Sequence, residues 1–191
     1  AKIAKEKNLT NVLVTNGYVH EQPLLELLPY IDAMNVDLKS MDEDFYKKNC
    51  KAKLPFILKA IELSYKQKTH IEITNLIITG MNDSEDQIQR LVDFVAGLSD
   101  RIPLHFSRYF PAHKMSIPAT PLQTLQKAFL LAKRKLKYVY IGNAYIPNTS
   151  NTYCPDCNEL LIRRDGYYTS IVGIKDKKCK KCGVPVDMVM K

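Results

Sequence analysis

The chain has 191 residues and a net charge of +8 at pH 7, with 46% hydrophobic and 25% charged residues. This is an ordinary globular composition for one domain with or without a small added module. No segment approaches the roughly 18 unbroken apolar residues of a membrane span, and the first residues lack the apolar core of a signal peptide. We therefore expect a cytoplasmic protein with no membrane partner.

Two periodicities alternate along residues 11–143. Five short runs rich in apolar and β-branched residues are typical of strands: 11–17, 33–40, 70–80, 103–110 and 137–143. Runs with helical spacing lie between them: 22–31, 41–49, 54–68, 84–98 and 120–137. Ser84 and Thr120 are the expected N-caps of the last two helices, with Pro121 at the first position of the final one.

The strands are predicted to be apolar on both faces, which is typical of a parallel sheet covered by helices. Right-handed crossovers then give either an open doubly wound sheet or part of a (β/α) barrel. The pattern stops at the polar stretch 146–152, and short strand-like runs follow: 159–164, 167–174 and 184–190. We expect an α/β fold with a barrel-like domain at 1–148 and a small module at 149–191.

Four of the five cysteines lie in the last forty residues, as two C-x2-C pairs separated by twenty-one residues: Cys154 with Cys157, and Cys179 with Cys182. Zinc takes four thiolates in a tetrahedron, and two such turns joined by a β-hairpin supply them. Gly183 permits the left-handed backbone that often follows the second turn. The spacing predicts a closed, structural zinc ribbon, although an iron site could use the same ligands, and Cys50 is predicted to be an ordinary thiol.

Ligands of parallel β/α folds bind at the carboxyl ends of the strands. Asp37 and Lys39 follow the second predicted strand and face the same side, because they are two residues apart. They could hold the ammonium and carboxylate of a zwitterionic ligand, or they could pair with each other as an internal salt bridge. Thr15 and Asn16 follow the first strand and could line a ligand or form only a turn.

The remaining polar residues point to no hydrolytic chemistry. We interpret His105 as a core histidine, and His70 as exposed. We find no nucleophile–base pair, no glycine-rich phosphate loop and no carboxylate pair, and so assign no catalytic residue. The lysines are scattered, without the interleaved aromatic residues of single-strand binders, and we therefore expect no nucleic-acid partner.

Four stretches occur in an order that resembles the later strands of radical S-adenosylmethionine (SAM) enzymes related to pyruvate formate-lyase activating enzyme: LVTNGY, MNVDLKS, ITNLIITGMNDSEDQI and PLHFSRYFPAHKM. YVYIGN followed by NTYCPDCNELLIRRDGY is similar to the AmmeMemoRadiSam-system radical SAM proteins. The resemblance covers nearly the whole chain. It implies an oxidoreductase that cleaves SAM reductively at a [4Fe–4S] cluster to give a 5′-deoxyadenosyl radical, with an unassigned substrate that is a small molecule or a protein.

The C-x3-C-x2-C loop that holds the family's cluster is absent from these residues. The chain also begins, at AKIAKEKNLT, as if inside an amphipathic helix. We therefore expect the C-terminal half of a partial (β/α) radical SAM barrel with a zinc ribbon, inactive alone because the cluster ligands lie outside it. The resemblance implies six SAM-binding residues: Thr15, Asn16, Asp37, Lys39, Asn75 and Leu76.

A second hypothesis is a non-enzymatic zinc-ribbon protein whose basic tail, KDKKCKKC, binds nucleic acid or a protein partner. The polar residues at the strand ends favour the enzyme, because a binding module would not need them.

Overall fold

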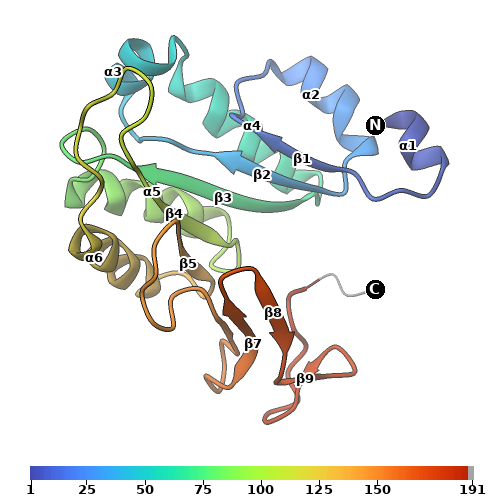
Figure 1. The fold of residues 1–191 in the computed structure, drawn as a ribbon. Helices are drawn as coiled ribbons and strands as arrows, with labels where there is room; N and C mark the ends of the chain where they lie inside the picture. The colour runs from blue at the N-terminus through green and yellow to red at the C-terminus, as the bar shows by residue number, and fades with distance from the viewer. Residues whose placement is uncertain (189–191) are drawn as a thin grey trace.

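The computed structural model describes residues 1–188, and its main element is a five-stranded parallel sheet (Figure 1). The strands lie in chain order: β1 (Val12–Thr15), β2 (Ala33–Asp37), β3 (His70–Ile77), β4 (Leu104–Arg108) and β5 (Val139–Gly142). Each predicted strand is present, with ends that differ by a few residues from those expected. Within residues 1–188, no helix combines the length and the apolar character needed to cross a membrane.

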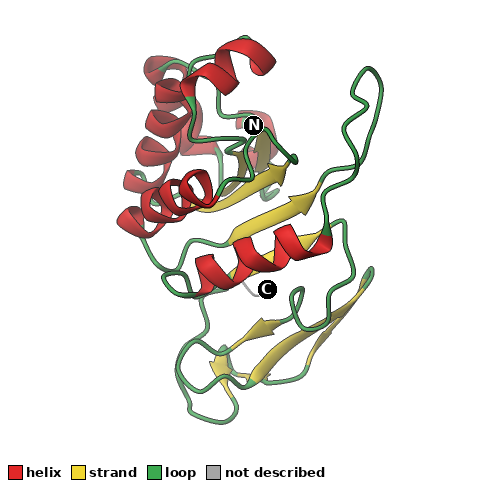
Figure 2. Cartoon of the chain, turned by 90° about the vertical axis from the view of Figure 1, so that its left-hand side faces the viewer, coloured by secondary structure: helices red, strands yellow, loops and turns green. Residues whose placement is uncertain are grey.

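Helices connect successive strands and gather on one side of the sheet (Figures 1 and 2). Their bounds are α1 (Lys2–Glu6), α2 (Glu21–Leu27), α3 (Glu43–Phe45), α4 (Leu54–Lys66), α5 (Glu85–Leu98) and α6 (Leu122–Lys133), with a 3-10 turn at Leu28–Tyr30 and a π turn at Tyr46–Cys50. Parallel neighbours that follow chain order require crossovers of one hand, which place the connecting helices α2–α6 on one face, whereas α1 precedes β1 and buries no residue. The architecture is therefore a partial (β/α) barrel rather than a doubly wound sheet.

The helix-facing side of the sheet forms the core. Burial alternates along β3, where Ile71, Ile73 and Ile77 are buried, and β4 adds Leu104 and Phe106, both 0% exposed. Side chains of this size each contribute about 1.5–3 kcal/mol when fully buried.

The opposite, concave face does not match the expectation of strands that are apolar on both faces. Its positions on β3 are occupied by His70, Glu72, Thr74 and Leu76, all partly exposed. The expectation was wrong for this face because the isoleucines of HIEITNLI mask a regular alternation with polar residues.

One predicted helix cap is confirmed and one is wrong. The Ser84 hydroxyl accepts a hydrogen bond from the Gln87 backbone N–H at the start of α5. In α6 the N-cap position is Pro121, and Thr120 lies before it, fully buried. The Thr120 hydroxyl instead donates to the Ile77 carbonyl at 2.5 Å, and so ties the start of α6 to the end of β3.

The C-terminal module contains small antiparallel sheets (Figure 1). One is formed by β6 (Thr152–Tyr153), β7 (Leu160–Asp165) and β8 (Tyr168–Ile171), the other by β9 (Ile174–Lys175) and β10 (Lys178–Cys179). The predicted hairpin between the two cysteine pairs is therefore present. Residues 184–188 contribute an isolated bridge from Pro185 to Lys178 instead of the predicted strand, and the rest of that strand, 189–190, lies outside the described residues.

Gly17 provides a direct test of how β1 is packed. Its φ of +69° is left-handed, and a β-carbon there would lie 2.8 Å from Val36 Cγ1 and 3.1 Å from Ile57 Cγ2. We expect Gly17→Ala to lower the free energy of unfolding by roughly 1–3 kcal/mol, because strain and overpacking add. The control is Gly97→Ala in α5, where a β-carbon would meet nothing within 4 Å. This change should raise the free energy of unfolding by up to about 1 kcal/mol, because alanine favours a helix more than glycine does. Urea unfolding measures both, and equal effects would contradict the packing argument.

Candidate functional site

The predicted SAM-binding residues lie at the carboxyl ends of three adjacent strands. Thr15 pairs in register with Val36, and Asp37 with Thr74, so the ends of β1, β2 and β3 meet at one edge of the sheet. The sheet therefore brings five of the six predicted residues to the end where parallel β/α folds bind ligands: Thr15, Asn16, Asp37, Lys39 and Leu76.

Thr15 and Asn16 organise a turn at that edge. The Thr15 hydroxyl accepts a hydrogen bond from the Gly17 N–H at 3.1 Å, and the Asn16 side-chain oxygen accepts one from the Tyr18 N–H at 3.0 Å. Side chains that bond to the backbone two residues on are typical of turns. A turn is present, and a role of these residues in cofactor binding stays a prediction.

Asp37 and Lys39 contact each other, with the Lys39 ammonium 2.9 Å from Asp37 Oδ2. Their side chains keep 38% and 33% exposure, so the pair lies at the surface of the site and not inside the sheet. An exposed ion pair of this kind contributes little to stability, at most about 1 kcal/mol. A zwitterionic ligand could therefore separate the two charges at small cost.

Asn75, the sixth predicted residue, lies on the helix-facing side of β3. It is 1% exposed, and its side-chain amide donates to the carbonyls of Leu38, at 2.7 Å, and Lys39, at 3.2 Å. Asn82 supports the same loop, because its amide donates to the Lys39 carbonyl at 2.5 Å and to the Leu76 carbonyl at 2.8 Å. Both asparagines hold the backbone that carries Lys39.

A second polar cluster lies on the concave face near the amino ends of the strands. Glu72 accepts hydrogen bonds from His105, at 2.8 Å, and His70, at 3.5 Å, with one carboxylate oxygen for each. The bond to His105, and then that to His70, hold the pKa of Glu72 well below its ordinary value, and the Glu72 bond raises the pKa of His70. His105 is thus not the core histidine that we expected, since its side chain is 30% exposed on the open face.

Tyr140 and Arg164 extend this cluster to the C-terminal module. The Tyr140 ring stacks on His105 with 5.1 Å between ring centroids, and the Arg164 guanidinium lies 5.5 Å from the Tyr140 ring centre. Sequence reasoning missed the whole group. The polar alternation at 70, 72 and 74 was a visible signal, whereas no local pattern indicates that Arg164 of β7 reaches β5.

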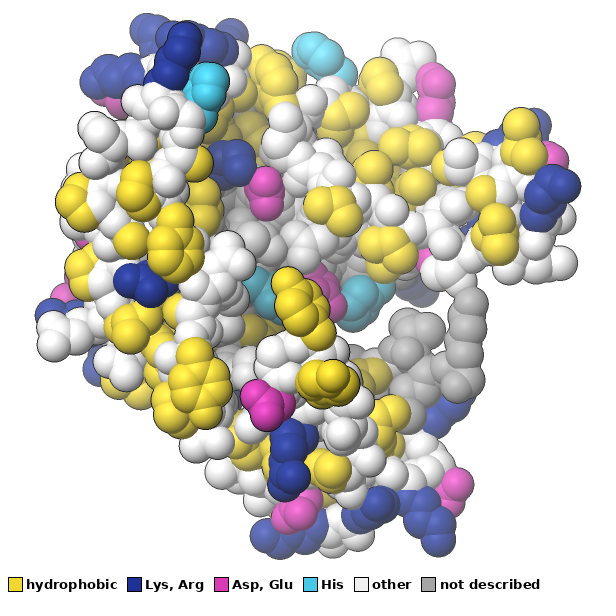
Figure 3. Space-filling model, in the orientation of Figure 1, with side chains coloured by type: hydrophobic (Ala, Val, Ile, Leu, Met, Phe, Trp, Pro, Cys, Tyr) yellow, Lys and Arg dark blue, Asp and Glu magenta, His cyan; other side chains and the backbone are white. Residues whose placement is uncertain are grey.

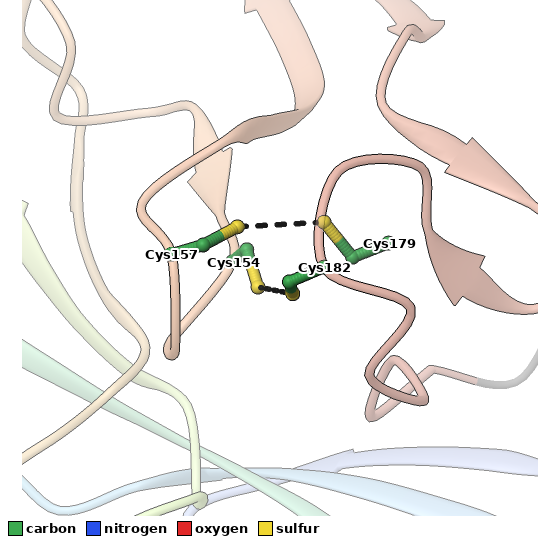
Figure 4. Close-up of side chains that lie close together, drawn as sticks. All are labelled: Cys154, Cys157, Cys179 and Cys182. Atoms are coloured by element: carbon green, nitrogen blue, oxygen red, sulfur yellow. Dashed lines mark hydrogen bonds between the residues drawn. The ribbon is translucent and has the colours of Figure 1, made fainter.

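The four cysteines of the tail form one centre, as predicted (Figure 4). Their sulfur atoms all lie within 4.8 Å of one another, and two pairs, Cys154 with Cys182 and Cys157 with Cys179, face each other at 3.6 Å. A tetrahedral zinc with bonds of about 2.3 Å would hold its sulfurs about 3.8 Å apart. The arrangement is consistent with a zinc ribbon.

The two cysteine turns have the same backbone geometry. In each, the first cysteine's carbonyl accepts from the N–H four residues on, Asn158 or Gly183, and both of these residues have left-handed φ angles. The prediction for Gly183 is thus confirmed, with φ +77°. Backbone N–H groups of Cys182 and Lys181 lower the pKa of Cys179, whereas burial and the neighbouring thiols raise the pKa of Cys157 and Cys182 against their own backbone N–H bonds.

Comparison with known proteins agrees with this architecture. An uncharacterized protein of Methanocaldococcus jannaschii, MJ0808, is 44% identical over 193 residues, covering 98% of this chain and 57% of that protein. The choline trimethylamine-lyase activating enzyme of Oleidesulfovibrio alaskensis is 23% identical over 113 residues, 59% of this chain and 36% of the enzyme. The chain thus spans little more than half of one relative and about a third of the other.

Solved structures share the fold. A domain of pyruvate-formate lyase-activating enzyme from Bacteroides vulgatus matches 74% of this chain and 86% of its own, with a TM-score of 0.64 and 23% identity. A radical SAM methyltransferase from Sphaerobacter thermophilus matches 71% of this chain and 41% of its own, with a TM-score of 0.57 and 14% identity. No protein-family model matches the chain. The fold is that of a partial radical SAM barrel, and the named relatives include activating enzymes.

Proposed function

We propose that the chain is part of a radical SAM oxidoreductase of the activating-enzyme kind, and that the carboxyl ends of β1–β3 bind SAM. The observation that carries the proposal is the partly exposed pair of opposite charges, Asp37 and Lys39, at the ligand-binding edge of a partial radical SAM barrel. A closer kinship to the AmmeMemoRadiSam-system proteins rests on the stretch NTYCPDCNELLIRRDGY.

The residues at this edge suit the amino-acid end of SAM. The Lys39 ammonium would meet its carboxylate and the Asp37 carboxylate its ammonium, so both charges remain paired when the ion pair opens. Leu76 would offer apolar contact from the concave face. Asn75 would act through the Leu38 and Lys39 carbonyls that it holds.

When bound at a reduced [4Fe–4S] cluster, SAM supplies a 5′-deoxyadenosyl radical that abstracts hydrogen from the substrate. These 191 residues hold no C-x3-C-x2-C loop, so the cluster ligands of the proposed enzyme lie outside them. What this chain contributes is binding and orientation of SAM. The test is 5′-deoxyadenosine formation by the whole protein, reconstituted anaerobically with iron and sulfide and given a strong reductant. If it forms none while its cluster is intact, the radical assignment fails.

We also propose that the four-cysteine centre holds one structural zinc. All four positions of a tetrahedron are taken by cysteine sulfur, which leaves no open position for a substrate or a catalytic water.

Replacing Lys39 tests the SAM site. In the whole protein, Lys39→Ala should weaken SAM binding by roughly 1.5–3 kcal/mol, the range for a hydrogen bond to a charged group. Isothermal titration measures the affinity, and zinc content should not change. Lys59→Ala is the control, because Lys59 is an exposed lysine on α4, away from the strand ends. If Lys39→Ala keeps the full SAM affinity, Asp37 and Lys39 pair only with each other and do not bind SAM.

A further inference from the structure

A cavity of about 670 Å³ opens between the concave face of the sheet and the C-terminal module. It lies at the amino ends of the strands, since Val12, Ala33 and His70 are the first residues of β1, β2 and β3. Figure 3 shows histidine and acidic side chains gathered in this hollow, with hydrophobic side chains beside them. The predicted SAM residues lie at the other ends of these strands, so the two places are separate.

The acidic side chains on the cavity wall all have partners of opposite or potentially opposite charge. These pairs are Asp32 with Lys5, Glu72 with His70 and His105, and Asp187 with Arg101. Asp187 also accepts a hydrogen bond from the Tyr138 hydroxyl at 2.7 Å. The carboxylates of the wall are therefore already matched, and none of them calls for a cationic ligand.

Arg164 is the exception among the charged groups of this wall. It is half-buried, and within residues 1–188 no carboxylate pairs with it. Its Nη1 donates to the Ser150 carbonyl at 3.0 Å and to the Thr152 hydroxyl at 2.7 Å, and these bonds fix the guanidinium over Tyr140. The guanidinium also makes a side-chain hydrogen bond with Tyr140, so all its partners within residues 1–188 are uncharged groups. A partly desolvated, unpaired guanidinium at a cavity is a site for an oxyanion.

We propose that this cavity binds a small organic anion whose carboxylate or phosphate group is held by Arg164. The apolar part of the ligand lies against Val12, Ala33 and Pro103, which also line the cavity. The volume is in the usual range for small-molecule sites, about 300–1,000 Å³. Inorganic phosphate would leave the apolar wall of the cavity exposed to water, whereas an organic anion would cover it. The proposed ligand is therefore organic. The site does not depend on SAM binding or cleavage by the protein.

The test is titration of the 191-residue protein with hexanoate, hexyl phosphate, inorganic phosphate and the neutral hexanamide, followed by NMR of backbone amides and arginine Nε–Hε groups. We expect hexanoate or hexyl phosphate to shift the Arg164 side-chain signal and the amides of Val12, Ala33 and Tyr140. Whichever of the two binds more tightly identifies the anionic group. Inorganic phosphate should bind at least tenfold more weakly, and hexanamide should cause no saturable shift.

Two arginine variants complete the test. Arg164→Gln should weaken the better anion at least tenfold, and Arg164→Lys should recover part of the loss because it keeps the charge. Arg163→Gln is the matched control, because Arg163 is the exposed neighbour of Arg164 on the same strand and should bind as the unchanged protein does. Zinc content and the amide spectrum of β1–β5 establish that each variant is folded. The proposal is overturned if neither organic anion binds, if hexanamide or inorganic phosphate binds equally well, or if Arg164→Gln and Arg163→Gln behave alike.

Discussion

Removing the metal from the four-cysteine centre should unfold the C-terminal module and leave the five-stranded sheet folded. Within residues 149–188 the module's own apolar core is small: Leu161, Ile162 and Ile174 are buried beside the cysteines, and the other hydrophobic residues packed against them are partly buried. At about 1.5–3 kcal/mol for each buried side chain, this core contributes less than the roughly 10–16 kcal/mol that a structural zinc supplies at pH 7, so the metal is the larger source of the module's stability.

Hydrogen exchange with mass spectrometry measures this effect. After treatment with a chelator, peptides from 149–188 should lose their protection, while those from β3 and α5 keep theirs. Cys179→Ser should have the same result, because Cys179 is a buried ligand of the centre. Cys50→Ser is the control: Cys50 is a free cysteine at the end of the π turn, and its replacement should leave both zinc content and tail protection unchanged.

Elemental analysis under reducing conditions decides the identity of the metal. We expect about one zinc per chain. One iron per chain would contradict the assignment of zinc, but the four cysteines would still be a metal-binding site. A protein that carries neither metal, with a tail that is still protected, would show that the four cysteines form an ordinary reduced core.

The sheet could be predicted from the sequence because its signals are local. Each of the first four strands is a short apolar run followed by a helical one, and few sheet topologies fit this alternation once right-handed crossovers are required. The cysteine centre could be predicted for the same reason. The geometry of each turn is set by residues within the turn, including the left-handed residue four positions after its first cysteine. What remained open was the choice between a doubly wound sheet and a barrel, because that depends on strand order.

The concave-face cluster could not be predicted, because it depends on contacts between distant segments. Glu72 and His105 meet only because β3 and β4 pair with Ile73 opposite Leu104, a register that the sequence does not reveal. Arg164 reaches Tyr140 only because the module folds back beside β5, where the Ile141 N–H donates to the Thr149 carbonyl.

Asn75 shows a subtler limit. The resemblance implies that it binds SAM, but its side chain lies on the helix-facing side of β3. Strand alternation decides this, because Asn75 shares its side with Ile73 and Ile77. The hydrogen bonds of Asn75 show that it holds the loop that carries Lys39, and its role in SAM binding stays a prediction.

Asn82→Ala should lower the free energy of unfolding by roughly 3–5 kcal/mol, a large effect for a residue in a loop. Asn82 is 2% exposed, and its side chain accepts from the Ile78 N–H at 2.7 Å while it donates to the carbonyls of Leu76 and Lys39. Alanine removes the Asn82 partner of the Ile78 N–H and of the Leu76 carbonyl, while the Lys39 carbonyl keeps its bond from Asn75, and each buried orphan costs about 1–3 kcal/mol. Urea unfolding of the 191-residue protein measures the loss.

Two further variants separate hydrogen bonding from packing at Asn82. Asn82→Asp keeps the shape and the acceptor but loses both donations and places a carboxylate beside two carbonyls, so it should destabilise at least as much as alanine does. Asp83→Ala is the neighbouring control, because Asp83 accepts one exposed hydrogen bond from the Gly80 N–H, and its loss should cost about 1 kcal/mol or less. A loss below 1 kcal/mol for Asn82→Ala would mean that water or a rearranged loop replaces its bonds. If the loss is as large as expected, the side-chain hydrogen bonds of Asn82 fix the backbone that carries Lys39, one of the two charged residues of the proposed SAM site.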